Sequence, residues 1–179
     1  SDRTSIHIHL DVRHLDTKEL IEFVALYIIF EKFFYAKCGD PERELNNHCR
    51  PLQSCTELYE SIRYLFSTSH GRVHAALSNW PKYSAVNLHP VLTQSSVEFR
   101  NHIGTSDKQE ILDWINIIFS LASYVRKNKK MDLQKEIDRV CSDGQRFFNS
   151  VFPNNREDFN DSIHSGMLEG ARYIQVPVN

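Results

Sequence analysis

"VEFRNHIGTSDKQEILDWI", residues 97 to 115, starts with a strand pattern and continues with a helix pattern, and it decides the fold class. Val97 and Phe99 alternate with Glu98 and Arg100, which predicts a strand with one apolar and one polar face. The carboxylate and the guanidinium therefore share a face. They form either a solvated ion-pair ladder, worth about a few tenths of a kcal/mol, or part of a site. In such a site Glu98 would bind a metal ion and Arg100 would clamp a phosphate or carboxylate.

The second half of this stretch carries the start signal of a helix. Ser106 is the expected N-cap, and Gln109 three residues later would close a capping box. Apolar residues then recur at helical spacing as far as the basic run at 126–130, whose positive charge favours a helix C-terminus. A strand followed at once by an amphipathic helix indicates a chain of mixed α and β structure.

The N-terminal region repeats this order of strand and helix. Residues 4–12, "TSIHIHLDV", alternate, so His7 and His9 should share the polar face of a second strand. Asp16 and Glu19 have capping-box spacing and predict a helix over residues 17–37. The two imidazoles would lie about 6.5 to 7 Å apart along the strand. They could ligate one metal ion, or one could bind metal while the other donates to a phosphate oxygen, or both could simply face solvent.

The remaining segments complete an α+β pattern with a small, mainly antiparallel sheet packed against helices. Two strands are expected over 82–91 and 95–103, joined by a turn at 90–95. We expect an irregular polar connection over 40–56, a short helix over 54–66, a loop or weak hairpin over 67–81, and helices over 131–152, broken at Gly144, and 156–174. Residues 1–130 are expected to form the α+β core and residues 131–179 a helical C-terminal extension.

Composition excludes several classes of protein. The 179 residues carry a net charge of −2, so no basic field favours nucleic acid. The most apolar window is too short and too charged to span a bilayer, and no signal peptide is visible. The four cysteines lack C-x-x-C spacing, which argues against structural zinc; reduced thiols and a cytoplasmic location are expected.

Two further polar segments are candidates for binding. The connection at 43–50 carries Arg43, Asn46, His48 and Arg50, which would suit an anion or carboxylate site, although polar loops are more often simply solvated. Lys82 lies at the start of the strand expected over 82–91 and would add a positive charge there.

These motifs, taken in order, resemble a known family. The series is H-x-H on a strand, a long helix, a loop R…N…C-R-P-L, then "KYSAVNLH", then "VEFRNHIGT", then a helix starting I-L-x-W-I. Over roughly residues 5 to 127 this series is similar to the amidoligases of the carboxylate–amine ligase superfamily, which is related to glutamine synthetase and glutamate–cysteine ligase. The resemblance implies a glutamine-synthetase-like sheet.

The resemblance also implies an activity and its cofactors. ATP would phosphorylate a carboxylate substrate, and an amine would displace the phosphate to form an amide or isopeptide bond; acid or amine could belong to a peptide or protein. Mg²⁺ or Mn²⁺ would bridge the phosphates, and basic side chains would neutralise the transferring phosphoryl group. By this resemblance His7 and Glu98 bind metal and Arg100 contacts phosphate or substrate. Nucleotide binding is assigned to His9, Lys82, Arg50 and Asn87.

One part of the family pattern is not found in this sequence. The family has an early strand of G-x-E-x-E type that supplies metal ligands, and the glycine before H-x-H is replaced here by Ser5 and Ile6. One His and one Glu are few ligands for a tight Mg²⁺ site, and three strands are few for a stable sheet. Either a preceding segment or a partner chain completes the site, or the domain is an inactive scaffold used for protein binding or regulation. A hydrolase using His7 and His9 on a transition metal is the third alternative.

Overall fold

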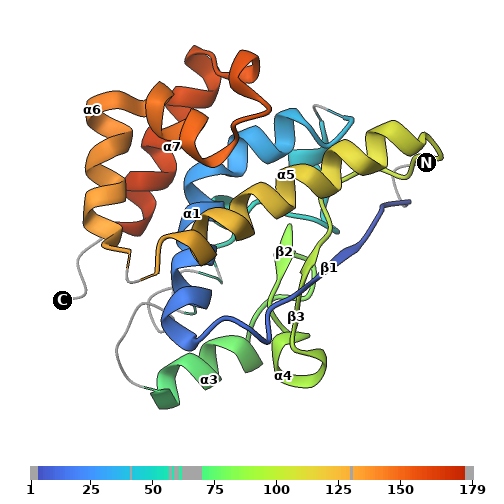
Figure 1. Cartoon of the computed structure of the whole chain (residues 1–179). Coiled ribbons are helices and arrows are strands. Elements are labelled where there is room, and N and C mark those ends of the chain that lie inside the picture. The colour runs from blue at the N-terminus through green and yellow to red at the C-terminus, as the bar shows by residue number, and fades with distance from the viewer. Residues whose placement is uncertain are drawn as a thin grey trace.

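The computed structural model describes residues 4–40, 42–56, 58, 61, 70–129 and 131–175. It has the expected α+β architecture, with one small antiparallel sheet and helices packed against it (Figure 1). The elements are β1 (Ile8–Asp11), α1 (Thr17–Ala36), η1 (Arg43–Leu45), η2 (Leu52–Ser54), α3 (His70–Ser78), β2 (Val86–Asn87), α4 (Val91–Gln94), β3 (Ser96–Phe99), α5 (Lys108–Lys127), α6 (Leu133–Val151), η3 (Arg156–Asp158) and α7 (Asp161–Ile174).

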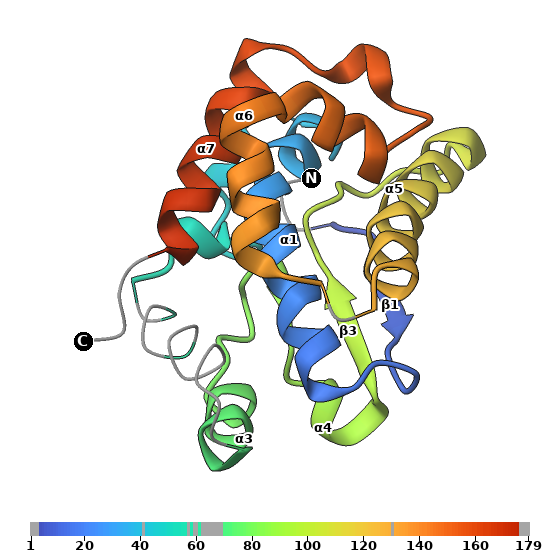
Figure 2. The ribbon, with the colours of Figure 1, turned by 60° about the vertical axis from the view of Figure 1, so that its left-hand side comes forward.

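Helix α1 is the central element of the core. The predicted capping box is present, because the Asp16 carboxylate accepts from the Glu19 backbone N–H at 2.8 Å and Glu19 accepts from the Asp16 N–H at 2.9 Å. Helix α1 lies between the sheet on one side and α6 with α7 on the other (Figures 1 and 2). Both sides of this helix are therefore buried.

The sheet has the strand order β1-β3-β2, and both pairings are antiparallel. The register places His9 and Asn87 on either side of Glu98, so these three side chains lie on one face. Phe99 points to the other face and contacts the rings of Phe23, Tyr27 and Phe34 on α1. The alternation read from the sequence is confirmed, and it separates a polar face from the aromatic core.

The C-terminal helices pack directly on α1. The rings of Phe147, Phe148 and Phe152 contact Phe30 of α1. On α7, a Cβ added at Gly170 would lie 2.4 Å from the Ile28 carbonyl oxygen, so the two helix backbones approach closely. The division of the chain at residue 130 stays a prediction.

Several local predictions need correction. The N-cap of α5 is Asp107 rather than Ser106, because its carboxylate accepts from two backbone N–H groups, those of Gln109 and Glu110. The loop or hairpin expected over 67–81 is wrong for residues 70–78, which form α3; Val73, Ala76 and Leu77 are buried at helical spacing.

Other boundaries also shift. The expected strands at 82–91 and 95–103 shorten to β2 and β3, and the turn between them contains the single helical turn α4. The kink in α6 falls at Asp143, one residue before Gly144. Most of the helix expected over 54–66 lies outside the described residues. Among the helices that the structure describes, none is long and apolar enough to cross a membrane.

Candidate functional site

The carboxylate of Glu98 is the centre of a polar cluster on the sheet. Its side chain is only 9% exposed. Asn87 of β2 donates its side-chain amide to Oε2 at 2.8 Å, and Arg100 donates to both carboxylate oxygens at 3.2 Å. The His7 Nδ1 lies 2.8 Å from Oε1. Segments far apart in the sequence therefore meet at one carboxylate, whereas the metal, phosphate and nucleotide roles expected of these residues stay predictions.

His7 is held from both of its ring nitrogens. Nδ1 faces Glu98, and Nε2 lies 2.8 Å from the Ser5 hydroxyl. Burial and the nearby Arg100 charge lower the pKa of His7 more than the Glu98 charge raises it, so the neutral ring is favoured at neutral pH. A neutral ring that donates to a carboxylate has its other nitrogen available as an acceptor or ligand.

His9 lies on the same face but at the margin of the cluster. Its Nε2 is 3.9 Å from Glu98 Oε1, and its Nδ1 is 3.0 Å from the Ser96 hydroxyl. The sequence reasoning did not single out Ser5 or Ser96 as partners of the two histidines. The alternation places Ser5 on the same face as His7 and His9, but it does not show that this serine or Ser96 would contact a histidine.

Arg100 connects this cluster to an exposed aromatic ring. Its guanidinium carbon lies 5.7 Å from the centroid of the Tyr83 ring, and Lys82 Nζ lies 5.9 Å from the same centroid. The Arg100 side chain is 11% exposed, and within the described part of the chain its Nε has no hydrogen-bond acceptor. A buried donor without an acceptor is unfavourable, so this position would gain from an anionic ligand.

The backbone of Arg50 joins the connection at 43–50 to the strand that carries Asn87. Arg50 donates its N–H to the Tyr83 carbonyl at 2.9 Å and accepts from the Ala85 N–H at 2.8 Å, which aligns it with the strand that carries Asn87. Arg43 is instead structural, because it is buried and donates to the backbone carbonyl of Asn101 at 3.0 Å. Arg43 is thus neither solvated nor free for an anion, and the anion site expected over 43–50 stays a prediction.

The Glu98 carboxyl is held in its ionised form. Burial raises its pKa, but the hydrogen bond from Asn87 and the charges of Arg100, His7 and His9 outweigh burial and lower the pKa overall. An ionised carboxylate is the form that binds a divalent cation.

The donor atoms of the cluster partly fit a divalent ion. The 2.8 Å contact between His7 Nδ1 and Glu98 Oε1 is a hydrogen bond. An ion held by both of these atoms would have to replace the proton between them. Across the described ranges, no group of three His, Cys, Asp or Glu side chains is placed to hold an ion. The residues present therefore fit an ion ligated mainly by substrate phosphates and water, as is common for Mg²⁺.

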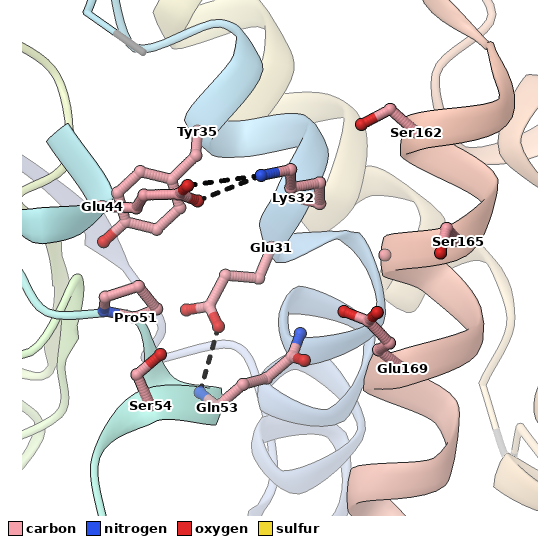
Figure 3. A pocket seen from close by; sticks show the side chains of 11 residues that line it. Glu31, Lys32, Tyr35, Glu44, Pro51, Gln53, Ser54, Ser162, Ser165 and Glu169 are labelled. Atoms are coloured by element: carbon pink, nitrogen blue, oxygen red, sulfur yellow. Dashed lines mark hydrogen bonds and ion pairs between the residues drawn. The ribbon is translucent and has the colours of Figure 1, made fainter. Parts of the chain in front are cut away.

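A separate cavity of about 400 Å³ lies between α1, α7 and the 51–54 segment (Figure 3). Glu31 projects toward it from α1, and its carboxylate accepts from the backbone N–H groups of Leu52 at 2.7 Å and Gln53 at 3.1 Å. Burial raises the pKa of Glu31 to about 7. Lys32 and Glu44 form an ion pair at this cavity. None of the residues predicted for the functional site lines it.

Comparison with known proteins identifies the family. Residues 1–122 match the family described as "Putative amidoligase enzyme". No curated protein and no solved structure matches the chain. The matched region includes every residue of the Glu98 cluster and covers 122 of the 179 residues, which is more than half of the chain. This chain therefore belongs to the amidoligase family.

Proposed function

We propose that the polar face of the sheet is an ATP-dependent carboxylate–amine ligase site. The observation that carries this proposal is the convergence of His7, Glu98 and Arg100 on one face, with donor–acceptor distances of 2.8 and 3.2 Å. Membership of the amidoligase family supports a ligase-type function. In this scheme a carboxylate is phosphorylated by ATP, and an amine attacks the acyl phosphate and releases phosphate.

Each part of the cluster has a role in this scheme. Glu98 and His7 would hold Mg²⁺ or Mn²⁺, which would neutralise charge on the nucleotide phosphates. Arg100, whose Nε lacks an acceptor within the described residues, would donate to the transferring phosphoryl group or to the substrate carboxylate. Nucleotide phosphates would be bound by His9, Lys82, Arg50 and Asn87.

The proposed site requires further ligands for its metal ion. Among the described residues no group of three His, Cys, Asp or Glu side chains is placed to hold an ion, and Mg²⁺ takes six ligands. We propose that a strand from a preceding segment or from a partner chain supplies more carboxylates. This reaction consumes ATP, which is consistent with the proposed cytoplasmic location.

A second candidate is an inactive scaffold that binds or regulates a protein. The observation that favours it is the saturation of Glu98, whose two oxygens already accept hydrogen bonds from Asn87, Arg100 and His7. In this case the cluster would be a buried ion-pair network, and no nucleotide would bind to it.

A thermal-shift titration with Mg²⁺·ATP distinguishes the two candidates. A nucleotide site predicts a dose-dependent rise in melting temperature, equivalent to about 2.7 kcal/mol at a hundredfold excess over Kd. Lys82→Ala should reduce the rise, whereas Lys135→Ala, at an exposed position on α6, should leave it unchanged. If millimolar nucleotide raises the melting temperature of neither the wild type nor either variant, the inactive scaffold is favoured.

A further inference from the structure

A polar cavity of about 620 Å³ lies between the first half of α5, the 154–158 segment and the C-terminal end of α1. Its wall carries five carboxylates, those of Asp107, Glu110, Asp113, Glu157 and Asp158. Of the described residues that line it, only Lys37 is basic. None of the residues of the Glu98 cluster lines this cavity, so it is separate from the proposed ligase site.

Most of the negative charge around this cavity is not neutralised by the protein. The ammonium group of Lys37 pairs with Asp158 at 3.0 Å. Within the described ranges, no Lys or Arg forms an ion pair with the other four carboxylates; Asp113 accepts instead from the neutral amide of Gln109 at 2.8 Å. Like charges around one cavity repel each other and attract a positively charged ligand.

Trp114 adds a buried donor to the wall of this cavity. It is 1% exposed, and within the described part of the chain its Nε1–H has no hydrogen-bond acceptor. The indole of Trp80, by contrast, donates to the Val86 carbonyl at 2.8 Å. Because an unsatisfied buried donor is unfavourable, the cavity would gain from a ligand that carries an acceptor such as a carbonyl oxygen.

His102 lies beside Trp114 and lacks a partner of the opposite kind. The two ring centroids are 5.0 Å apart. His102 is 1% exposed, and its Nδ1–H donates to the Ile103 carbonyl at 2.8 Å, which leaves Nε2 as an acceptor in the neutral ring. Among the described residues Nε2 has no hydrogen-bond donor, and it lies 3.9 Å from Oε1 of Glu110, which is also an acceptor. A ligand that carries a donor would satisfy both atoms.

We propose that this cavity binds a basic peptide segment of another protein. Its Lys or Arg side chains would meet the carboxylates, and its backbone would supply the acceptor for Trp114 and a donor for His102 and Glu110. The side-chain amides of Asn116 and Asn154, which also line the cavity, can each donate to and accept from further peptide groups.

The spacing of the carboxylates favours a peptide over a metal ion. Across the described residues, no group of three His, Cys, Asp or Glu side chains is placed to hold one ion. Alternate side chains of an extended peptide lie about 6.5 to 7 Å apart on one face, so its positive charges are spread in the same way as the carboxylates of the wall. The proposal does not depend on the ligase function, and its test needs no nucleotide.

Isothermal titration calorimetry of the full chain tests the charge match. The probe is a blocked peptide of alternating lysine and glycine. We expect saturable binding that weakens several-fold when the salt concentration rises from about 50 to about 200 mM. A peptide of alternating glutamine and glycine should not bind. Spermidine carries positive charges but no carbonyl group and should bind more weakly than the lysine peptide; equal binding of the two would overturn the assignment to a peptide.

The indole N–H signals in nuclear magnetic resonance locate the bound peptide. The signal of Trp114 should shift as the lysine peptide is added, whereas that of Trp80, which already has an acceptor, should not. A Trp→Phe substitution at either position assigns the two signals. Binding that leaves the Trp114 signal unchanged would overturn the proposed site.

Charge-removing variants complete the test. Asp113→Asn and Glu157→Gln, both at exposed positions, should each raise the Kd for the lysine peptide about two- to fivefold. The matched control is Asp138→Asn on α6, because Asp138 accepts from Gln134 at 2.9 Å as Asp113 accepts from Gln109 on α5. This control should leave the Kd unchanged. A wild type that does not bind the lysine peptide overturns the proposal, and so does a control that weakens binding as much as Asp113→Asn.

Discussion

Removal of the Glu98 carboxylate should destabilise the protein far more than a surface ion pair would. The carboxylate is 9% exposed and is bonded to Arg100, which is 11% exposed. The variant Glu98→Ala leaves that guanidinium buried without its counter-charge, and it also leaves the Asn87 amide without its acceptor. The expected loss of stability is therefore that of a buried ion pair from which one partner has been removed.

The size of this loss follows from the burial of both partners. Breaking a buried ion pair from one side costs about 3–5 kcal/mol. We expect about 3 kcal/mol for Glu98→Ala, because the neighbouring His7 side chain is 35% exposed and water can reach the margin of the cluster. Glu98→Gln retains an acceptor for Asn87 but also leaves Arg100 without its counter-charge, so we expect a loss only somewhat smaller, about 2–3 kcal/mol.

Urea unfolding at pH 7 measures these losses. A double-mutant cycle with Glu98→Gln and Arg100→Met should give a coupling energy of about 2 kcal/mol, because the double variant has no unpaired charge. Glu157→Ala, at an exposed carboxylate in η3, is the control and should change stability by less than about 0.5 kcal/mol. If Glu98→Ala cost no more than this control, the cluster would be a solvated ladder and the reasoning would be refuted.

Three further predictions concern the rest of the fold. Burial raises the pKa of Glu31 from 4.5 to about 7, so the folded state binds the proton more tightly and stability falls by roughly 3 kcal/mol as pH rises from about 4.5 through about 7. Urea unfolding against pH should show a smaller slope for Glu31→Gln, and parallel curves for the variant and the wild type would contradict this. Gly170→Ala would place a methyl group 2.4 Å from the Ile28 carbonyl oxygen and should lower the free energy of unfolding by about 1–3 kcal/mol. An unchanged melting temperature would instead support residues 131–179 as a loosely attached extension. Asp107→Ala removes the N-cap of α5 and should lower the stability by about 1 kcal/mol, whereas Ser106→Ala should lower it much less. Thermal unfolding measures both, and equal losses of stability would contradict the assignment of the cap.

The polar face of the sheet could be predicted because its information is local. A strand has a period of two, so Glu98 and Arg100 must share a face whatever the rest of the chain does. The capping box at Asp16 and Glu19 is likewise contained in four residues. The pairing of His7 with Glu98, from segments ninety-one positions apart, came from the resemblance, because no local pattern specifies which strands pair.

Features that depend on distant contacts were not predictable from local patterns. Strand β2 has only two ladder residues, since the Ala85 N–H donates to the Arg50 carbonyl, although the Ala85 carbonyl still accepts from the Arg100 N–H. The segment of α3 contains Gly71, which weakens a helix signal. Its few apolar residues did not indicate a helix by themselves, and the folded structure shows that they are buried. The hydroxyls of Ser5 and Ser96 carry no sequence signal that distinguishes them from solvated serines.

The most direct test of the account is nuclear magnetic resonance of the histidine side chains with Mn²⁺·ATP as a paramagnetic probe. The account predicts that the signals of His7 and His9 broaden at low ratios of probe to protein. The signal of His164, which lies on α7 against α6, should stay sharp. Broadening that is absent from His7 and His9, or equal for His164, would contradict a nucleotide–metal site on this face of the sheet.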